Sequence, residues 1–573
     1  MKNIKKNIVY LLGLGLLTLN SCGDEFLTKL PQGELSQPQI ENQDGVEANL
    51  LSAYGIMNGN INGTWGNYGA APSQWVFGEM PSDNAHKGSE ASDQPNMNMI
   101  EGFNTNSTND NLSNMWRVYY EGVLRVNNTL KLLAAEQAGT QQISADRALV
   151  IQAEGRMLRA HYYFYLWRVF KNIPYVDENT TYEESITKPN TEDVLPKIID
   201  DLEFAVANLP VEKVNGQAGR MNKAIAQAYL GKVLLYQKKY PEALVLFNAV
   251  MTGKDITTMP YQNNFDVTKE DGPEAILVAK HAINSDGGGD NANVGDMLNS
   301  INGSFTGCCG FFQPSIDLVN AFKVDANGLP FLDNSYRTNP YLSDLKITNP
   351  TELANYKVNV NLAMDPRLDY TVGRRGVQYL DWGIMAGNTW VRSQNYAGPF
   401  VGIKSTIPRS EFGANAAAGV NYLTGLDVNI IRLADVYLMA AECNVEMNDL
   451  PEALRLVNAI RTRAANLPHK KNEDGVDAAK YNVKPYLSFT DQDHARRAVR
   501  FERRLELAME GHRFFDLVRW GVAKQTIESY SAFEGQHLSS FLGITFQPSH
   551  EYWPIPQGEI DRSNGSLTQN TGY

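Results

Sequence analysis

The stretch that decides the fold is Asn222–Met251, with the sequence NKAIAQAYLGKVLLYQKKYPEALVLFNAVM. Its apolar and small residues recur at the spacing of a tetratricopeptide unit, which is a pair of antiparallel helices. Gly231 and Ala243 are small at the positions where the two helices would approach closely, and Tyr240 closes the turn between them. The stretch therefore predicts a helical hairpin.

A second copy of this pattern lies at Arg432–Arg463, where Leu450-Pro451-Glu452-Ala453 parallels Tyr240-Pro241-Glu242-Ala243. Two unrelated helical hairpins are the alternative interpretation. Because such hairpins cannot bury their apolar faces alone, further helices are expected to complete the stack. Helical periodicity predicts them at 46–57, 112–135, 147–170 and 192–209.

The two hairpins are separated by residues 262–425, which are rich in Gly, Asn, Asp, Pro and aromatic residues. Short strands are expected at Ala275–Ala279 and Phe400–Ile403. A final helix is expected at Ala495–Met509, with its many arginines and glutamates forming a salt-bridged surface. The predicted fold class is mainly α, a tetratricopeptide-like helical hairpin scaffold with a long, irregular, loop-rich insertion at about 262–425.

The first 22 residues have the layout of a bacterial lipoprotein signal. Three lysines precede an apolar run, Ile8–Leu19, which is too short to span a bilayer and ends in Asn20-Ser21-Cys22. We expect a signal peptide at 1–21, lipidation of Cys22, a tether at 22–45 and a single domain at 46–573. Acyl chains such as palmitate on Cys22 would anchor the chain to a membrane. An ordinary secretory signal with a chance cysteine is the alternative.

Composition excludes several classes of protein. The 573 residues carry a net charge of -13, which repels phosphate backbones, so we expect no nucleic-acid partner. No apolar run reaches about 18 residues, which argues against a multi-span membrane protein. Four cysteines in a chain of this length cannot form a disulfide framework.

Motifs of catalysis are absent from the sequence. The eight histidines are scattered and form no H-E-x-x-H or other metal-ligand spacing, and no G-x-S-x-G element occurs. A glycosidase carboxylate pair would leave no such signature. We expect no catalytic residues, no metal and no cofactor.

The C-terminal part carries Glu510–Gly521, EGHRFFDLVRWG, which is followed by Tyr552-Trp553-Pro554-Ile555-Pro556. Together with Asp365-Pro366-Arg367 and Arg432–Tyr437, these motifs resemble the SusD/RagB family of Bacteroidetes glycan-binding lipoproteins. The resemblance covers essentially the whole mature chain. Gly23-Asp24-Glu25 is similar to the surface-export signal of lipoproteins from these bacteria.

The resemblance implies a lipoprotein of the outer membrane that faces the exterior and is not an enzyme. Such a protein captures an oligosaccharide or polysaccharide and delivers it to a SusC-like TonB-dependent transporter. A tetratricopeptide-type protein-binding scaffold and a surface glycan hydrolase are the alternatives. The segment 365–376 and the paired cysteines resemble members from fructan systems. Arg513, Asp516 and Arg519 are expected to form buried ion pairs rather than a glycan site.

Glycan contacts are expected on loops, where aromatic faces meet the C–H faces of sugars and polar groups bind the hydroxyls. The resemblance also implies contacts around Ser82-Asp83-Asn84. Three loop stretches supply the expected glycan-binding residues: Trp65, Trp75, Asp83 and Asn84; Cys308, Cys309 and Phe311; and Arg374, Trp382, Trp390 and Tyr396.

Cys308 and Cys309 are adjacent and flanked by glycines. In an exported chain they can form a disulfide whose rigid ring would serve as a stacking platform for a sugar. Two unpaired cysteines packed in the loop are the alternative. Cys443 lies on the apolar side of a repeat helix and is expected to be a buried free thiol.

Overall fold

The computed structural model of the protein describes residues 40–61, 65–303 and 306–573. The expected signal peptide, Cys22 and most of the expected tether lie outside these residues. The first helix, α3 (Gln43–Gly55), begins within the stretch expected to be a tether, because Asn42 caps it through a hydrogen bond to the N–H of Gly45.

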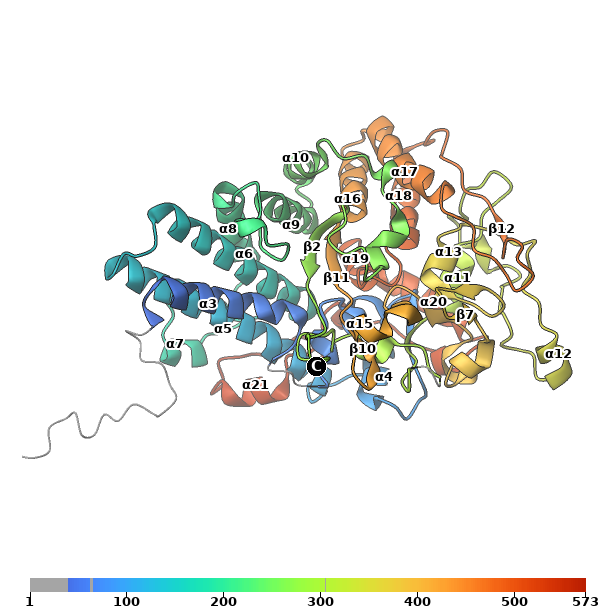
Figure 1. Ribbon diagram of the computed structural model, residues 1–573, viewed down its shortest axis with the longest axis horizontal. Helices are drawn as coiled ribbons and strands as arrows, with labels where there is room; N and C mark the ends of the chain where they lie inside the picture. Colours follow the sequence, from blue (N-terminus) through green and yellow to red (C-terminus); the bar gives the residue numbers. More distant parts are fainter. Residues whose placement is uncertain (1–39, 62–64, 304–305) are drawn as a thin grey trace, which may run out of the picture.

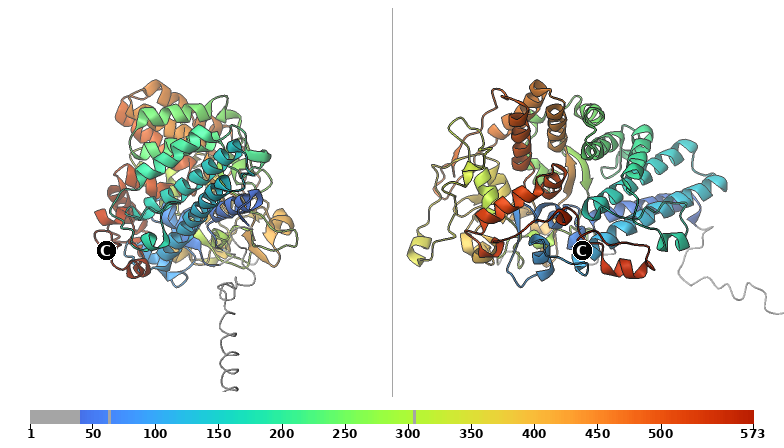
Figure 2. Two further views of the ribbon diagram at one scale, coloured as in Figure 1. Left: turned by 90° about the vertical axis from the view of Figure 1, so that its left-hand side faces the viewer. Right: turned by 180° about the vertical axis from the view of Figure 1, so that it is seen from behind.

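The long helices that precede residue 252 build the part of the molecule that lies on the left in Figure 1 and on the right in the rear view of Figure 2. They pack in chain order, α5 on α6, α6 on α8, α8 on α9 and α9 on α10. The predicted helices are therefore confirmed, each extended or shortened by a few residues at its ends. The long helices are α5 (Asp110–Ala138), α6 (Ala145–Phe170), α8 (Leu195–Asn208), α9 (Lys223–Tyr236), α10 (Tyr240–Met251), α16 (Leu433–Glu446), α17 (Leu450–Ala465) and α18 (Gln492–Glu506).

Both predicted hairpins form, α9 with α10 and α16 with α17, and α10 packs against α16. The close approach expected at Gly231 is confirmed, because a Cβ atom there would lie 2.6 Å from the ring of Phe247. The two hairpins are therefore adjacent in space although the long insertion separates them in sequence. Cys443, on α16, is a buried free thiol as expected.

The insertion consists of short strands and helices at the right and the lower edge of Figure 1. β2, predicted at its observed bounds, pairs antiparallel with β11 and so closes the base of the insertion. The strands are β1 (Ala85–Gly88), β2 (Ala275–Ala279), β3 (Phe311–Pro314), β4 (Ala363–Met364), β5 (Val372–Gly373), β6 (Gln378–Tyr379), β7 (Gly383–Ile384), β8 (Val401–Gly402), β9 (Ala416–Ala417), β10 (Val420–Thr424), β11 (Val428–Arg432) and β12 (Lys480–Tyr481).

Shorter helices join these parts. The prediction that the final helix ends at Met509 was wrong, because α18 ends at Glu506 and three further α-helices follow it. The shorter helices are α4 (Pro95–Glu101), α7 (Tyr182–Ile186), α11 (Ile316–Ala321), α12 (Pro350–Ala354), α13 (Leu368–Thr371), α14 (Gln394–Ala397), α15 (Phe412–Asn415), α19 (Arg513–Arg519), α20 (Ala523–Glu534) and α21 (Gln557–Arg562). None of the described helices is long and apolar enough to cross a membrane.

The charged side chains in the last turns of α18 face the interior, so the expectation of a salt-bridged surface holds only earlier in the helix, where Arg496 and Arg497 form partly exposed ion pairs. Glu506 accepts hydrogen bonds from Arg367 at 3.0 Å, Arg432 at 2.7 Å and Arg463 at 2.5 Å, and all four residues are buried. Burial by itself would raise the pKa of Glu506, but these guanidinium groups lower it to about 2. The charges are tolerated inside because each has several partners from distant segments.

The C-terminal motif forms ion pairs in the interior, as expected. Asp516 accepts from Arg503 at 2.6 Å and from Arg519 at 2.8 Å, and Arg513 donates to Asp83 at 2.7 Å. These pairs tie α19 to α18 and to the loop that precedes β1. The motif therefore closes the fold.

Candidate functional site

The segment after β1 and the segment before β3 meet because the two strands pair antiparallel, with Gly88 opposite Phe311. The pairing continues beyond the strands, since the N–H of Ser89 donates to the carbonyl of Gly310 at 2.5 Å. Cys308 and Cys309 come directly before Gly310 and are joined by a disulfide. Of the two alternatives that the sequence left open, a disulfide and two unpaired cysteines, the structure therefore has the disulfide.

The loop after β1 is fixed from both sides by positive charges. From the inside, Lys87 donates to the carbonyls of Glu90 at 2.7 Å and Asp93 at 2.5 Å. Burial, the largest cause, lowers the pKa of Lys87 to about 8. From the outside, the Arg392 guanidinium binds the carboxylates of Asp93 at 2.7 Å and Glu90 at 3.0 Å. This outer ion pair is partly exposed and can exchange hydrogen bonds with a ligand.

Two half-buried tyrosines lie near this ion pair. Tyr68 begins a short 3-10 helix, Tyr68–Ala70, and Tyr422 lies in β10. Burial, then the nearby Tyr422 and Asp93, raise the pKa of the Tyr68 hydroxyl. These electrostatic effects place the Tyr422 hydroxyl and the Asp93 carboxylate in the neighbourhood of the Tyr68 hydroxyl. Figure 1 shows α4 and β10 near the lower edge of the molecule, on this side.

We call this face the loop surface. Trp65, three residues before Tyr68 in the chain, is 54% exposed, and Cys308 is half-buried. Half-exposed rings can stack on the C–H faces of sugars, while a guanidinium and a carboxylate bind hydroxyl groups. The loop surface consists of Tyr68, Asp93, Cys308, Arg392 and Tyr422, and the exposed Trp65 lies close to it in the sequence.

Trp75 and Phe311, which the sequence analysis predicted as glycan contacts, lie instead in the protein interior. The Trp75 ring packs against Phe312 at 5.6 Å and Phe311 at 6.4 Å between centroids, and its Nε1 donates to the carbonyl of Gly295 at 3.0 Å. Both residues and Cys309 are buried, so they have no face for a surface ligand. Their packing joins the first and second predicted loop stretches.

Asp83 and Asn84 are also buried. The Asp83 carboxylate pairs with Arg513, and the Asn84 side-chain oxygen accepts from Arg504 at 2.8 Å. Their polar groups are bound by arginines of α18 and of the C-terminal motif, so neither side chain is exposed at the surface for direct contact with a glycan. They hold the loop that leads into β1.

The third predicted stretch is largely a small core of its own. Arg374 is buried and binds Asp369 through two hydrogen bonds of 2.7 and 2.8 Å. Trp382 donates to the carbonyl of Ile407 at 3.0 Å, and Trp390 packs edge-on against a tyrosine at 5.5 Å. With both tryptophans over nine-tenths buried, these three residues support the loop rather than contact a ligand.

Tyr396, the last residue of the third predicted stretch, is half-buried. Its hydroxyl donates to Asn98 at 2.8 Å, and the ammonium of Lys87 lies 5.1 Å from its ring centroid. The stretch reaches the loop surface through Arg392, whose Cβ lies 3.9 Å from a Cβ built on Gly310. The structure thus brings all three predicted stretches together; of the expected glycan-binding residues, Trp65 is exposed, Cys308 and Tyr396 are half-buried and the others are buried.

Sequence reasoning missed four residues of the loop surface. Tyr68 and Arg392 lie inside two of the predicted stretches, and an inventory of every aromatic and arginine there would have included them. Asp93 and Tyr422 carry no such signal, because only the pairing of distant segments brings them to this face.

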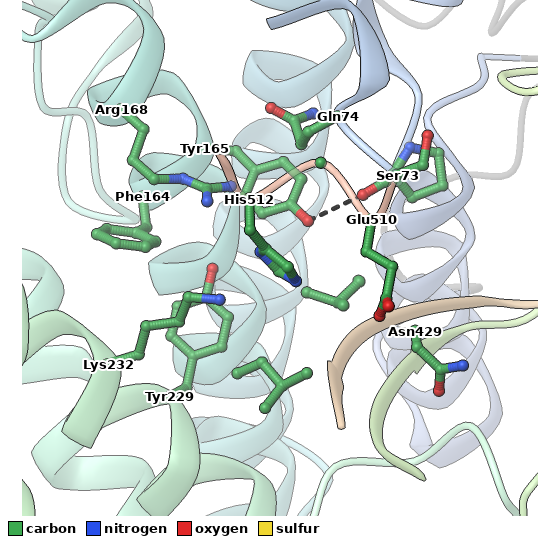
Figure 3. A pocket seen from close by; sticks show the side chains of 14 residues that line it. Ser73, Gln74, Phe164, Tyr165, Arg168, Tyr229, Lys232, Asn429, Glu510 and His512 are labelled. Carbon is green, nitrogen blue, oxygen red and sulfur yellow. Dashed lines mark hydrogen bonds between the residues drawn. The ribbon is translucent and has the colours of Figure 1, made fainter. Parts of the chain in front are cut away.

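An internal pocket lies behind the loop that leads to Trp75 (Figure 3). It measures about 10 Å³, room for about one water molecule and too little for a sugar. Tyr165 donates to the carbonyl of Pro72 at 3.0 Å, which fastens this loop to α6. Burial lowers the pKa of Lys232 in its wall to about 8, although Asp435, 3.0 Å away, opposes the shift. The pocket is part of the scaffold.

In the described part of the chain, no group of three or more His, Cys, Asp or Glu side chains could hold a metal ion. This finding does not test the expectation that the protein has no catalytic residues, metal or cofactor.

The chain is similar to known proteins along nearly its whole length. A family model described as "SusD family" matches residues 273–573, and one described as "Starch-binding associating with outer membrane" matches 56–235. SusD-like protein P25 of Formosa agariphila is 22% identical over 96% of this chain and 97% of its own.

Solved structures are similar in fold. A SusD superfamily protein from Bacteroides vulgatus has a TM-score of 0.68 at 19% identity, covering 93% of this chain and 100% of its own. A laminarin-binding SusD-like protein has a TM-score of 0.61 at 25% identity, with the same coverage. The mainly α fold with tetratricopeptide-like hairpins is therefore shared with these structures.

Proposed function

Because this chain belongs to the SusD family, we propose that it is a glycan-binding protein of the cell surface that captures an oligosaccharide or polysaccharide on its loop surface. The observation that carries this proposal is the pair of partly exposed rings, Tyr68 and Tyr422, near the Arg392–Asp93 ion pair, with the exposed Trp65 three residues before Tyr68 in the sequence. The description of the second family model, starch binding in association with the outer membrane, supports it.

The identity of the glycan has to be found by testing a panel of polysaccharides. A 25% identical structural neighbour binds laminarin, which makes β-glucans a reasonable first probe. The sequence segment that suggested fructan gives no support, because Asp365, Arg367 and Arg374 are all buried. The panel should therefore include laminarin, starch and a fructan, each tested under the same conditions.

Binding without turnover is the expected behaviour of the purified protein. Calorimetric titration across the panel should give heat with one polysaccharide, and reducing ends should stay constant over a long incubation. New reducing ends would identify a hydrolase. Heat with no saccharide, but with a protein from the outer membrane, would favour the alternative of a protein-binding scaffold.

Delivery to a SusC-like TonB-dependent transporter is the second part of the proposal. It rests on the family and on the lipoprotein-like leader that ends at Cys22. Cys22→Ala should move the protein from the membrane fraction to the soluble fraction, whereas the wild-type protein should co-purify with a TonB-dependent barrel in mild detergent. A stable complex of this kind buries roughly 2,000 Å² or more.

The Cys308→Ser/Cys309→Ser variant is the matched control for this anchoring experiment, since it alters the loop surface and leaves the leader intact. It should stay in the membrane fraction and on the exterior, where added protease can reach it. A Cys22→Ala protein that remains membrane-bound would contradict the lipid anchor.

A further inference from the structure

An arginine-lined cleft of about 260 Å³ lies among α18, α19 and α20, away from the loop surface. Its fourth wall is the segment 332–337. Among the described residues that line it, the one carboxylate is that of Asp83. The five arginines of its lining are Arg337, Arg497, Arg500, Arg504 and Arg513.

The base of the cleft has more positive than negative groups. Arg513 and Arg504 share Asp83, at 2.7 and 3.2 Å, while Arg504 and Arg337 share Asp317, at 2.9 and 2.5 Å. Three guanidinium groups are thus matched by two carboxylates. Burial alone would raise the pKa of Asp83, but Arg504 and Arg513 hold it well below its ordinary value, so both partners are charged.

Arg500 adds a cation that no carboxylate binds within the described residues. Its Nε atom is buried without a hydrogen-bond partner, and its guanidinium lies 4.8 Å from the ring centroid of Trp520. The acidic groups that act on it, Glu442 and Glu446, are each bound by another arginine. Burial, the largest cause, lowers the pKa of Arg500.

Arg500 is partly buried, and a cation that loses solvation without gaining an anion costs free energy. The Asp493 carboxylate near the rim does not compensate for it, since Asp493 is bound by Arg497 of the same helix at 3.1 Å. The position of Arg500 is therefore explained better by an anion that enters the cleft than by the stability of the fold.

The first turn of α20 supplies further donors to the same cleft. Val522, Gln525 and Thr526 line it, and no side chain caps the N-terminus of this helix of 12 residues. The first N–H groups of a helix carry a partial positive charge and favour anions. The N-terminus of α20 and the arginines therefore both favour a negatively charged group in the cleft.

We propose that this cleft binds a tetrahedral oxyanion, a sulfate or phosphate group. Guanidinium groups match the oxygens of such an ion in pairs, and the cleft is several times the roughly 30 Å³ of one water molecule. The group comes either as a substituent of a saccharide or as the free ion. This site is separate from the loop surface, so its existence does not depend on the proposed function.

Arg500→Gln tests the site directly. In calorimetric titrations with sodium sulfate and sodium phosphate, at an ionic strength held constant with sodium chloride, the wild-type protein should bind one ion per chain. Arg500→Gln should bind it at least tenfold more weakly. Arg500→Lys, which keeps the charge, should lose less. Arg455→Gln, on the exposed face of α17, is the matched control and should bind like the wild type.

Since Arg500 has no ion-pair partner to lose, Arg500→Gln should fold and melt close to the wild type. If it does not, Gln525→Glu serves instead, because it places a negative charge at the exposed rim and should weaken binding at least fivefold. Equal affinity in the wild type and in both variants, or equal loss in Arg455→Gln, overturns the proposal.

The two sources of the oxyanion are separated by glucose 6-sulfate, with glucose as its neutral control. Binding of the sugar sulfate that depends on Arg500 would assign the site to a substituted saccharide. Binding of the inorganic ions with exclusion of the sugar sulfate would assign it to the free ion. Failure of all these anions to bind would contradict the site while leaving polysaccharide binding at the loop surface intact.

Discussion

Glu506→Gln is expected to destabilise the protein by about 3–5 kcal/mol, the cost of breaking a buried ion-pair network on one side. Glu506 is the shared acceptor of Arg367, Arg432 and Arg463, and the neutral amide removes one of the carboxylates that compensate these buried charges. Denaturant unfolding measures the change. Glu452→Gln is the control, because its pair with Arg455 is on the surface and contributes at most about 0.5 kcal/mol.

The destabilisation should also depend on pH. The folded-state pKa of Glu506, about 2, lies below its ordinary value of 4.5, so its stabilising contribution is fully present above about pH 4.5. That contribution is lost as the pH falls through 2. The difference in stability between wild type and Glu506→Gln should therefore shrink between pH 4.5 and 2. A difference that is constant over this range would contradict the network as described.

The double variant Tyr68→Ala/Tyr422→Ala is expected to lose at least about fivefold in polysaccharide affinity. Each ring that stacks on a sugar contributes about 0.5–1.5 kcal/mol, and 1.4 kcal/mol is a factor of ten. Both side chains are half-buried at the edge of the core, so the melting temperature has to be measured with the affinity.

Tyr182→Ala is the matched control for this variant, because Tyr182 is 75% exposed on α7, in the helical half of the molecule. It should bind the polysaccharide like the wild type. A double variant that folds and binds with wild-type affinity would remove the loop surface from the proposed function. Equal losses in Tyr182→Ala would show that the assay does not report on a defined site.

The helical scaffold could be predicted from the sequence because its signals are local. The spacing of Gly231, Ala243 and Tyr240 predicts one hairpin, and the second copy follows from the same offsets. The inward-facing charges of α18 could not be predicted in this way. Whether Glu506 is buried depends on Arg367 and Arg432, which precede it by more than 70 residues and come from other elements.

The loop stretches of the candidate site could be predicted from composition, but the residues that face outward could not. Trp75 and Tyr68 are seven residues apart in one stretch, yet the first is buried and the second is half-exposed. The difference arises because β3 places Phe311 and Phe312 against Trp75. Packing between segments that are distant in the sequence cannot be recognised from the spacing of residues in a single sequence.

The central claim is that the loop surface binds the saccharide. Its most direct test is a crystal structure of the mature protein with the oligosaccharide that the polysaccharide panel selects. We predict a sugar ring stacked on Tyr68 or Tyr422, with its hydroxyl groups bonded to Arg392 and Asp93. A saccharide bound elsewhere, on the long helices or in the arginine-lined cleft alone, would contradict the account.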